Sequence, residues 1–436
     1  MYFAYNILLA MALVLSAPWW LLEMMRHGKY RAGLGERLGR VPRRLRDAGG
    51  RETIWIHAVS VGEVLTISPI VEELKTRLPG WRVAVSTTTD TGQRLARDRF
   101  GDQNVFHFPL DFSFAVQAYL RALQPRMLIL AESEFWPNVM RLAKKAGVRI
   151  AVVNARVSDR SLPRYLRFHA LLRPMMRNVD VFVAQSELDA QRLVEIGAPD
   201  ERVKVGGNLK FEVKPPGKLP VAENFAAALA RDAVGPVIVA GSTLEGEEAM
   251  LLECFRQVCE QYASAVMVLA PRHPERFTPV AALLESSGLP WERRSAWGGD
   301  QLPAGGVFLL DSIGELAALY RFADLAFVGG SLVPRGGHNI LEVALCAVPI
   351  VVGPHTENFR DIVRIFQQSE ALWVVTPETL VPTVLELLSN SEQRKQLGQR
   401  AFAVIRTQQG ATGRTVDALM GLVRVQSRTH AAETRA

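Results

Sequence analysis

Acidic residues stand directly after two segments of this sequence that are expected to form β-strands. Glu63 follows a strand expected over Thr53–Val59, and Glu132 and Glu134 follow a strand expected over Met127–Leu130. A carboxylate at such a position can take a proton from an attacking hydroxyl, which is the task of a general base within hydrogen-bond reach. Two acidic groups at strand ends of one domain therefore predict a catalytic centre.

Each of these acids also has a simpler interpretation. Glu63 can merely favour the N-terminus of the following helix electrostatically. Glu132 and Glu134 are two residues apart, and strand periodicity would send both side chains to the same side. The strand pattern therefore leaves open which of the two faces a substrate.

The second half of the chain carries features that suit an anionic ligand. Arg272 follows a strand expected over Ala265–Leu269 and supplies a cation there. The glycine-rich stretch 329–339 opens a helix, and such loops present backbone N–H groups and a positive dipole end to phosphate. Glu342, one turn into that helix, can accept ribose hydroxyls. The alternative is an ordinary turn capped by Asn339.

Other chemistries have little support. No G-x-G-x-x-G follows an expected strand and no G-x-x-x-x-G-K-[ST] occurs, which counts against hydride transfer and P-loop chemistry. The eight histidines lack H-x-x-x-H spacing and no D-x-D is present, so we expect neither a metal site nor a cofactor. Cys254, Cys259 and Cys346 form no C-x-x-C pair and indicate a reduced compartment.

The elements that must position these residues alternate regularly. From Thr53 onward short β-branched runs alternate with amphipathic segments, which is typical of parallel βαβ units. A Pro/Gly-rich break between Gly206 and Lys218 interrupts the pattern, which then restarts. We therefore expect two Rossmann-like α/β domains with an interdomain cleft, and ligands beyond the carboxyl ends of the strands. The expected parts are an N-terminal domain over 53–212, a linker over 213–222, a C-terminal domain over 223–425 and a flexible tail over 426–436.

The N-terminus has a different character. Residues 1–22 contain no charge and are almost entirely apolar, which is the length of about 20 residues that one helix needs to cross a bilayer. We therefore expect a membrane anchor over 1–25 and a basic juxtamembrane segment over 26–52. The positive-inside rule places the remaining chain in the cytoplasm. Asn6 and Pro18 keep an alternative open, an apolar helix docked on the protein.

Charge is concentrated near this helix. The formal net charge is +7, and part of the excess follows the apolar stretch, so nucleic acid is not the first inference and anionic lipid headgroups suit it better. Residues 164–177 are also basic and apolar at once, which predicts an interfacial surface or an ordinary amphipathic helix. The basic residues that follow the apolar stretch are Arg26, Lys29, Arg31, Arg37, Arg40, Arg43, Arg44 and Arg46.

Several motifs, in this order along nearly the whole chain, closely resemble the 3-deoxy-D-manno-octulosonic acid (Kdo) transferases of lipopolysaccharide synthesis. The resemblance implies the GT-B fold, CMP-Kdo as donor, and the lipid A precursor (lipid IVA) as acceptor at the cytoplasmic face of the bacterial inner membrane. The motifs are His57-Ala58-Val59-Ser60-Val61-Gly62-Glu63, Glu132-Ser133-Glu134-Phe135-Trp136-Pro137-Asn138, Asn154-Ala155-Arg156, Gly207-Asn208-Leu209-Lys210-Phe211, Pro271-Arg272-His273-Pro274-Glu275-Arg276-Phe277 and Gly329-Gly330-Ser331 through Asn339.

The resemblance also implies roles for individual residues. Glu63 is the proton acceptor, Glu132 and Lys210 assist the transition state, and direct displacement of CMP predicts inversion at the anomeric carbon. Two rival hypotheses are a nucleotide-sugar epimerase of the same architecture and a non-catalytic, membrane-tethered nucleotide-binding scaffold. The expected CMP contacts are Pro271, Arg272, Ile313, Gly314, Glu315, Asn339, Ile340, Leu341 and Glu342.

Overall fold

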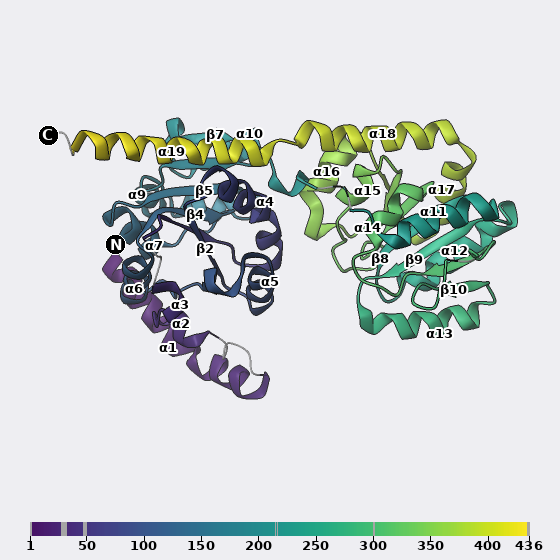
Figure 1. Ribbon diagram of the computed structural model, residues 1–436, viewed down its shortest axis with the longest axis horizontal. Coiled ribbons are helices and arrows are strands. Elements are labelled where there is room, and N and C mark those ends of the chain that lie inside the picture. The colour runs from purple at the N-terminus through teal and green to yellow at the C-terminus, as the bar shows by residue number, and fades with distance from the viewer. Residues whose placement is uncertain are drawn as a thin grey trace. The chain divides into compact units, whose positions relative to one another are not determined.

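The computed structural model describes residues 2–27, 33–46, 50–213, 215, 217–299 and 301–433 (Figure 1). Lys29 and Arg31 of the expected basic segment lie outside the described residues, as do Lys214 and Pro216 of the expected linker and the last three residues of the expected tail. The chain divides into two compact units, Met1–Glu212 with Gln409–Ala436, and Val213–Gln408.

The first unit is built on a parallel seven-stranded sheet with the order β3-β2-β1-β4-β5-β6-β7. Its central strands are buried on both faces, as their continuous apolar runs require. Ile54 and Ile56 pack into one core cluster and Trp55 into the other, because alternate side chains of a strand point to opposite faces. The strands are β1 Thr53–His57, β2 Arg82–Thr87, β3 Val105–His107, β4 Pro125–Ala131, β5 Arg149–Ala155, β6 Val181–Ala184 and β7 Val203–Val205.

Helices cover both faces of this sheet. Among them α19 is the last helix of the chain, and Figure 1 shows it in yellow along the elements of the first unit. The helices are α1 Tyr2–His27, α2 Leu34–Arg37, α3 Arg43–Arg46, α4 Val61–Arg77, α5 Asp90–Phe100, α6 Ser113–Leu123, α7 Pro137–Lys145, α8 Leu162–Arg167, α9 His169–Met176, α10 Glu187–Glu195 and α19 Ala411–Glu433.

The placement of α19 differs from the sequence-based division, which assigned the chain up to residue 425 to the C-terminal domain. Ala411, Val416 and Leu419 are fully buried in the core cluster that also contains Ile54 and Ile56. The apolar side of this helix is thus covered by the first unit, and sequence order alone does not reveal which of two similar sheets a terminal helix will cover.

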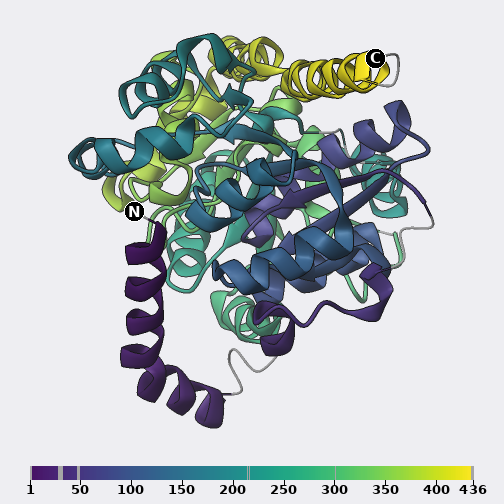
Figure 2. The same cartoon turned by 90° about the vertical axis from the view of Figure 1, so that its left-hand side faces the viewer.

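The expected transmembrane anchor is not found, because no helix among the described residues is long and apolar enough to cross a membrane. The apolar stretch does form a helix, α1. Figure 2 shows that α1 bends along its length, and Pro18 lies inside the helix, where it removes a backbone hydrogen bond.

The start of α1 is docked on the first unit. The Asn138 side-chain amide donates to Asn6 Oδ1 at 2.9 Å, and the Arg141 guanidinium lies 4.7 Å from the Tyr2 ring centre. Further along, Val14 and Leu15 are 70% and 80% exposed. The helix is therefore attached by its first turns, while the large apolar side chains that follow face solvent.

The second unit repeats the architecture with a parallel sheet of order β10-β11-β9-β8-β12-β13-β14. Its core is a separate cluster that includes Phe255 and Leu269. The strands are β8 Val237–Thr243, β9 Val266–Pro271, β10 Trp291–Arg293, β11 Gly306–Leu309, β12 Leu325–Val328, β13 Ile350–Val352 and β14 Trp373–Val374. The helices are α11 Pro220–Asp232, α12 Glu247–Gln261, α13 Phe277–Ser287, α14 Leu316–Leu319, α15 Leu341–Leu345, α16 Arg360–Gln368, α17 Pro377–Ser389 and α18 Ser391–Gln408.

Candidate active site

Glu63 lies in the first turn of α4, just beyond the carboxyl end of β1. Ser60 is the N-cap residue, but its side chain does not cap the helix and instead donates to Glu63 Oε1 at 3.3 Å. The Val59 N–H donates to the other carboxylate oxygen at 2.8 Å. The carboxylate is therefore held over the end of β1 by the two residues that connect the strand to the helix.

The surroundings of Glu63 oppose its ionisation. Burial raises its pKa from 4.5 to about 7, the Val59 N–H opposes that shift, and the negative charges of Glu132 and Glu134 add to it. A carboxylate with a pKa near neutrality is matched to accepting a proton at physiological pH.

Glu132 and Glu134 do not continue the strand, which corrects one sequence-based expectation. β4 ends at Ala131, and Glu132 has a left-handed backbone with φ of +56°. Strand periodicity therefore does not apply to the pair. Glu132 Oε1 lies 3.6 Å from Lys210 Nζ, and burial together with the charge of Glu132 raises the pKa of Glu134. The structure thus joins Glu132, rather than Glu134, to the predicted lysine.

Lys210 comes from the far side of the sheet, after β7, which is three strands away from β4. Two asparagine side chains hold the segment that carries Lys210 in place. Asn154, with φ of +52° at the end of β5, accepts the Leu209 N–H at 3.0 Å, and Asn208 accepts the Lys210 N–H at 3.0 Å. The 3₁₀ turn Leu209–Phe211 is fixed in this way to the end of β5.

Asn154 and Asn208 were present in the motifs but had no role in the sequence-based site. Their signal was the residue type, because asparagine tolerates positive φ and can hydrogen-bond nearby backbone groups. Glu63 is thus close enough to Glu132 to feel its charge, Glu132 pairs with Lys210, and the two asparagines position the lysine.

In the second unit, Arg272, His338 and Glu342 form an electrostatic cluster. Pro271 ends β9, and the Arg272 N–H donates to the Thr243 carbonyl at 3.0 Å. Burial lowers the pKa of His338 to about 4, with further contributions from Arg272 and His273. Burial raises the pKa of Glu342, and the charge of Arg272 opposes this shift. His338 is thus a neutral, largely buried member of this group that the sequence-based site did not include.

The glycine-rich loop after β12 differs from the expected phosphate cradle. Glu247, which is fully buried at the start of α12, accepts the N–H groups of Gly330 at 2.7 Å and of Ser331 and Leu332 at 2.9 Å each. It also accepts the Leu244 N–H at 2.9 Å. A carboxylate therefore occupies three amides at the start of the loop, those of Gly330, Ser331 and Leu332, and it fixes the conformation of that part of the loop.

The remaining predicted contacts follow the ends of β11 and β12. Asn339 Oδ1 accepts the Leu341 N–H at 3.1 Å, although Ile340 is the N-cap residue of α15. Ile313 and Gly314 are exposed after β11, whereas both oxygens of Glu315 pair with Arg294, at 2.9 and 3.0 Å. The Glu315 side chain is thus committed to Arg294. β11 and β12 lie on either side of β9 and β8, so these loops share one edge of the sheet.

Known proteins with related sequences match most of the chain. The family model described as 3-Deoxy-D-manno-octulosonic-acid transferase (kdotransferase) matches residues 32–213. A 3-deoxy-D-manno-octulosonic acid transferase of Bordetella pertussis is 36% identical over 92% of this chain and 96% of its own length. One from Haemophilus influenzae is 35% identical over 84% of this chain and 86% of its own length.

Solved structures agree at the level of the fold. A crystal structure of a glycosyltransferase from Rickettsia africae covers 86% of this chain and 99% of its own, with a TM-score of 0.53 and 13% sequence identity. The two parallel-sheet α/β units are thus those of GT-B-like glycosyltransferases. Together with the two relatives of 35% and 36% identity, this shows that the chain belongs to the 3-deoxy-D-manno-octulosonic acid transferase family.

Proposed function

We propose that this protein is an inverting glycosyltransferase that moves Kdo from CMP-Kdo to the lipid A precursor, lipid IVA, in lipopolysaccharide biosynthesis. Family membership supports the substrate class. The structural observation that carries the proposal is Glu63, a carboxylate with its pKa raised to about 7 beside Glu132 and Lys210.

Glu63 acts as the general base. It takes the proton of a sugar hydroxyl on the acceptor while the hydroxyl oxygen forms a bond to the anomeric carbon of Kdo. The bond from that carbon to the phosphate oxygen breaks, and CMP leaves with the bonding electron pair. Displacement in a single step inverts the anomeric configuration.

Lys210 and Glu132 assist this step as a pair. Kdo carries a carboxylate. The Lys210 ammonium group lies 3.6 Å from Glu132 and can also interact with that carboxylate or with the leaving phosphate. Fixed charges that stabilise the charge developing in a transition state supply much of the rate enhancement of enzymes. Glu132 orients the lysine until substrate arrives.

The donor is held by the second unit. Arg272 meets the single phosphate of CMP, Glu342 and Asn339 recognise the nucleoside, and backbone groups of Ile313, Gly314 and Glu315 contribute further contacts. Pro271, Ile340 and Leu341 complete the set. A donor with one phosphate needs no metal ion to bridge a diphosphate. We expect Arg272→Ala to weaken CMP binding in a titration, and unchanged affinity would remove this residue from the site.

The protein works at the cytoplasmic face of the bacterial inner membrane, with membrane lipids as partners. The exposed apolar side chains of α1, among them Val14, Leu15 and Trp19, suit insertion into the interface between headgroups and acyl chains. The α8–α9 segment adds exposed Leu166, Phe168 and Leu171 with several arginines. These two surfaces keep the enzyme near an acceptor whose chains stay in the bilayer.

The decisive experiment compares Glu63→Gln with Glu73→Gln on the same helix. Purified proteins are incubated with CMP-Kdo and lipid IVA, and products are identified by mass spectrometry. Glutamine keeps the shape of Glu63 but cannot accept the proton, so we expect transfer to fall roughly 10²–10⁴-fold while CMP binding persists. Glu73 is part of an exposed pair with Arg77, so its variant should retain activity.

Other outcomes would overturn the proposal. Full turnover by Glu63→Gln would exclude it as the base. Release of a modified sugar nucleotide without any glycolipid would indicate an epimerase, and CMP binding without product in the unmutated protein would indicate a scaffold.

A further inference from the structure

The edge strand of the second sheet, β10, continues into a segment that runs beside a neighbouring turn. β10 lies at the end of the strand order and pairs in parallel with β11. Directly after it, the Arg294 N–H still donates to the Leu309 carbonyl at 2.9 Å. The segment 293–295 therefore lies next to the chain that leaves β11 and forms the turn 312–314.

Both ends of the turn 312–314 are held by this segment. Before the turn, Asp311 accepts the Ser295 N–H at 2.8 Å and the Ser295 hydroxyl at 2.6 Å. After the turn, the two oxygens of Glu315 accept from Arg294 Nε at 3.0 Å and from Arg294 Nη2 at 2.9 Å. A guanidinium that meets both oxygens of a carboxylate fixes its orientation as well as its distance. The turn is thus anchored before and after by one short stretch of chain.

The contact between Arg294 and Glu315 is stronger than an ordinary surface ion pair. Exposed pairs contribute little, because both partners stay hydrated and lose side-chain entropy. Here the two side chains are only 25% and 19% exposed, and the pairing is bidentate. The Ser312 hydroxyl also donates to Glu315. Removing the guanidinium therefore frees one end of the turn.

The turn itself offers an uncharged surface. The carboxylates on either side of it are engaged by the segment 293–295. Ile313 is 68% exposed, and Gly314 is exposed with φ of +90°, a conformation that glycine adopts without strain. An apolar side chain beside open backbone groups suits a flat, uncharged ring with a few hydrogen-bonding atoms. It does not suit a phosphate.

The turn and Arg272 lie at the same edge of the sheet. β11 is next to β9, and the Leu310 N–H donates to the Leu269 carbonyl at 2.8 Å. Arg272 follows Leu269 by three residues, so the cation and the turn leave neighbouring parallel strands at their carboxyl ends. A nucleotide whose phosphate meets Arg272 can therefore place its nucleobase at the turn.

We propose that Arg294 is a positioning residue of the donor site, which holds the turn 312–314 in the conformation that receives the nucleobase. It does not touch the donor but acts through Glu315. The identity of the nucleotide rests on the proposed function. Without the pair, the turn is in the binding conformation for only part of the time, and the affinity for the nucleotide falls by that fraction.

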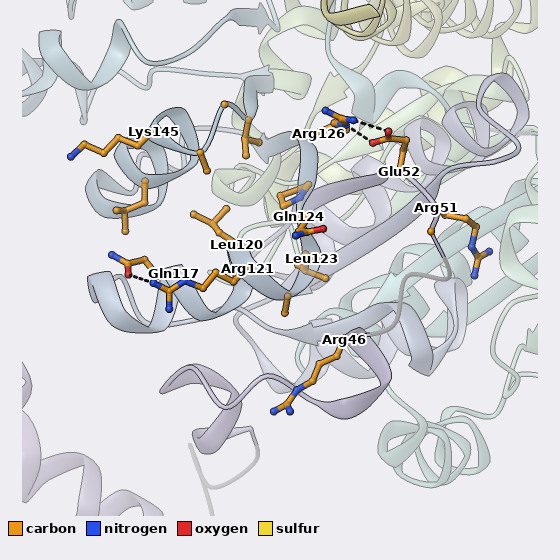
Figure 3. A pocket seen from close by; sticks show the side chains of 17 residues that line it. Arg46, Arg51, Glu52, Gln117, Leu120, Arg121, Leu123, Gln124, Arg126 and Lys145 are labelled. Carbon is orange, nitrogen blue, oxygen red and sulfur yellow. Dashed lines mark hydrogen bonds and ion pairs between the residues drawn. The ribbon is translucent and has the colours of Figure 1, made fainter. Parts of the chain in front are cut away.

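The test measures CMP binding to the full-length protein by calorimetry. Arg294→Gln removes the paired contact and should weaken binding roughly three- to tenfold. Arg294→Lys keeps the charge but not the bidentate geometry, so its loss should be smaller. The matched control is Arg126→Gln in the first unit, where Arg126 Nε and Nη2 lie 2.5 and 2.9 Å from the oxygens of Glu52 (Figure 3). The control should bind CMP like the unmutated protein.

Two further measurements separate positioning from direct contact and from damage to the fold. Glu315→Gln should weaken CMP binding as much as Arg294→Gln, and the double variant should bind no more weakly than either, because both changes remove the same pair. Ribose 5-phosphate lacks the nucleobase, and its affinity is measured by competition with CMP. That affinity should be unchanged in Arg294→Gln, since the turn meets neither the ribose nor the phosphate.

The opposite results would overturn the inference in distinct ways. If Arg294→Gln binds CMP normally while Arg272→Ala binds it weakly, the donor site stands and the role of Arg294 is refuted. Additive losses in the double variant would show that the Glu315 side chain contacts the nucleotide itself. Equal losses for CMP and ribose 5-phosphate would show that Arg294 only supports the fold. If the unmutated protein does not bind CMP, both the proposed donor and this inference are wrong.

Discussion

The burial of Glu63, the proposed base, makes its ionised form costly to the fold. Its pKa of about 7 reflects chiefly the loss of hydration and, to a smaller extent, the charges of Glu132 and Glu134. Perturbed acids of this kind are concentrated at functional sites, where the strain they impose is compensated elsewhere.

The first prediction concerns the pH profile of transfer. Because Glu63 must be ionised to accept a proton, kcat/KM should fall as the pH decreases below about 7. Replacing Glu134 by glutamine removes one neighbouring negative charge and lowers the pKa of Glu63, so the acidic limb should move to lower pH. Glu73→Gln serves as the control. An acidic limb that stays in place in Glu134→Gln would contradict the assignment.

The second prediction concerns stability. The pKa of Glu63 is about 7 in the folded state against 4.5 for a free side chain. The contribution of this carboxyl group to stability is therefore fully present below pH 4.5, where it is protonated in both states, and it is lost as the pH rises through 7. Glu63→Gln should therefore be more stable than the unmutated protein at pH 8, by about 3 kcal/mol at most. Denaturant titrations at pH 5 and pH 8 test this, and an equal difference at both values would refute it.

At the scale of elements, the glycine-rich loop depends on one carboxylate. Glu247 uses one oxygen for Ser331 and Leu332 and the other for Leu244 and Gly330. A glutamine has only one acceptor oxygen, and its NH₂ group cannot accept hydrogen bonds. One of the two pairs of N–H groups would therefore be left without an acceptor. The loop that leads to Asn339 and Glu342 would therefore lose the acceptor for one or two of its three N–H groups.

We accordingly expect Glu247→Gln to weaken CMP binding and to lower the stability of the second unit, by about 1–3 kcal/mol for each buried N–H left without an acceptor. The matched control is Glu253→Gln, an exposed position on the same helix. CMP titration and thermal unfolding are the measurements. A variant that loses stability but keeps full CMP affinity would show that the loop conformation does not matter for the donor.

The α8–α9 segment buries part of its apolar surface and leaves another part exposed. Met175 and Met176 are buried in the first unit, as an ordinary amphipathic helix requires, whereas Leu166, Phe168 and Leu171 are 44–50% exposed. The helices separate at Phe168, and Pro174 lies inside α9 instead of ending a helix. Proline removes one backbone hydrogen bond, and the buried methionines beyond it hold the last turn in place.

We expect the arginines of this segment to contribute to membrane binding. Replacing Arg164, Arg167, Arg173 and Arg177 by glutamine should weaken co-sedimentation with anionic vesicles, because each basic residue near such a surface contributes about 1 kcal/mol. High salt should reduce the difference from the unmutated protein. The control replaces Lys75, Arg94, Arg99 and Lys204, which are exposed elsewhere in the same unit. Equal binding of the two variants would show that α8–α9 does not face the membrane.

At the scale of the whole molecule, the chain leaves its first unit at Glu212 and returns to it at Gln409. The return is anchored by α19, where the Arg414 Nε donates to the Gly206 carbonyl at 2.8 Å and the Thr412 N–H donates to Glu212 Oε1 at 3.2 Å. The two ends of the second unit are thus attached to the same part of the first.

The last prediction follows from this return. Leu419 is fully buried among residues of the first unit, so Leu419→Ala should destabilise that unit by about 2–5 kcal/mol. Hydrogen exchange should show faster exchange in β1, β4 and β5 and unchanged exchange in β8 and β9. Leu388→Ala, buried in the core of the second unit, should give the reverse pattern. Faster exchange in β8 and β9 of Leu419→Ala would place α19 with the second unit.

The sequence by itself determined the family and the two α/β units, and it led to the prediction that Glu63 is the base, because these depend on local patterns. Apolar runs such as Ile54-Trp55-Ile56 specify a buried parallel strand, and an acid that follows such a strand must lie at the edge where ligands bind. The pairing of Glu132 with Lys210, the occupation of the loop amides by Glu247 and the packing of α19 were decided only by the tertiary structure. These contacts join residues 78, 83 and more than 300 positions apart. No local pattern encodes them, since they depend on which distant surfaces meet when both sheets form.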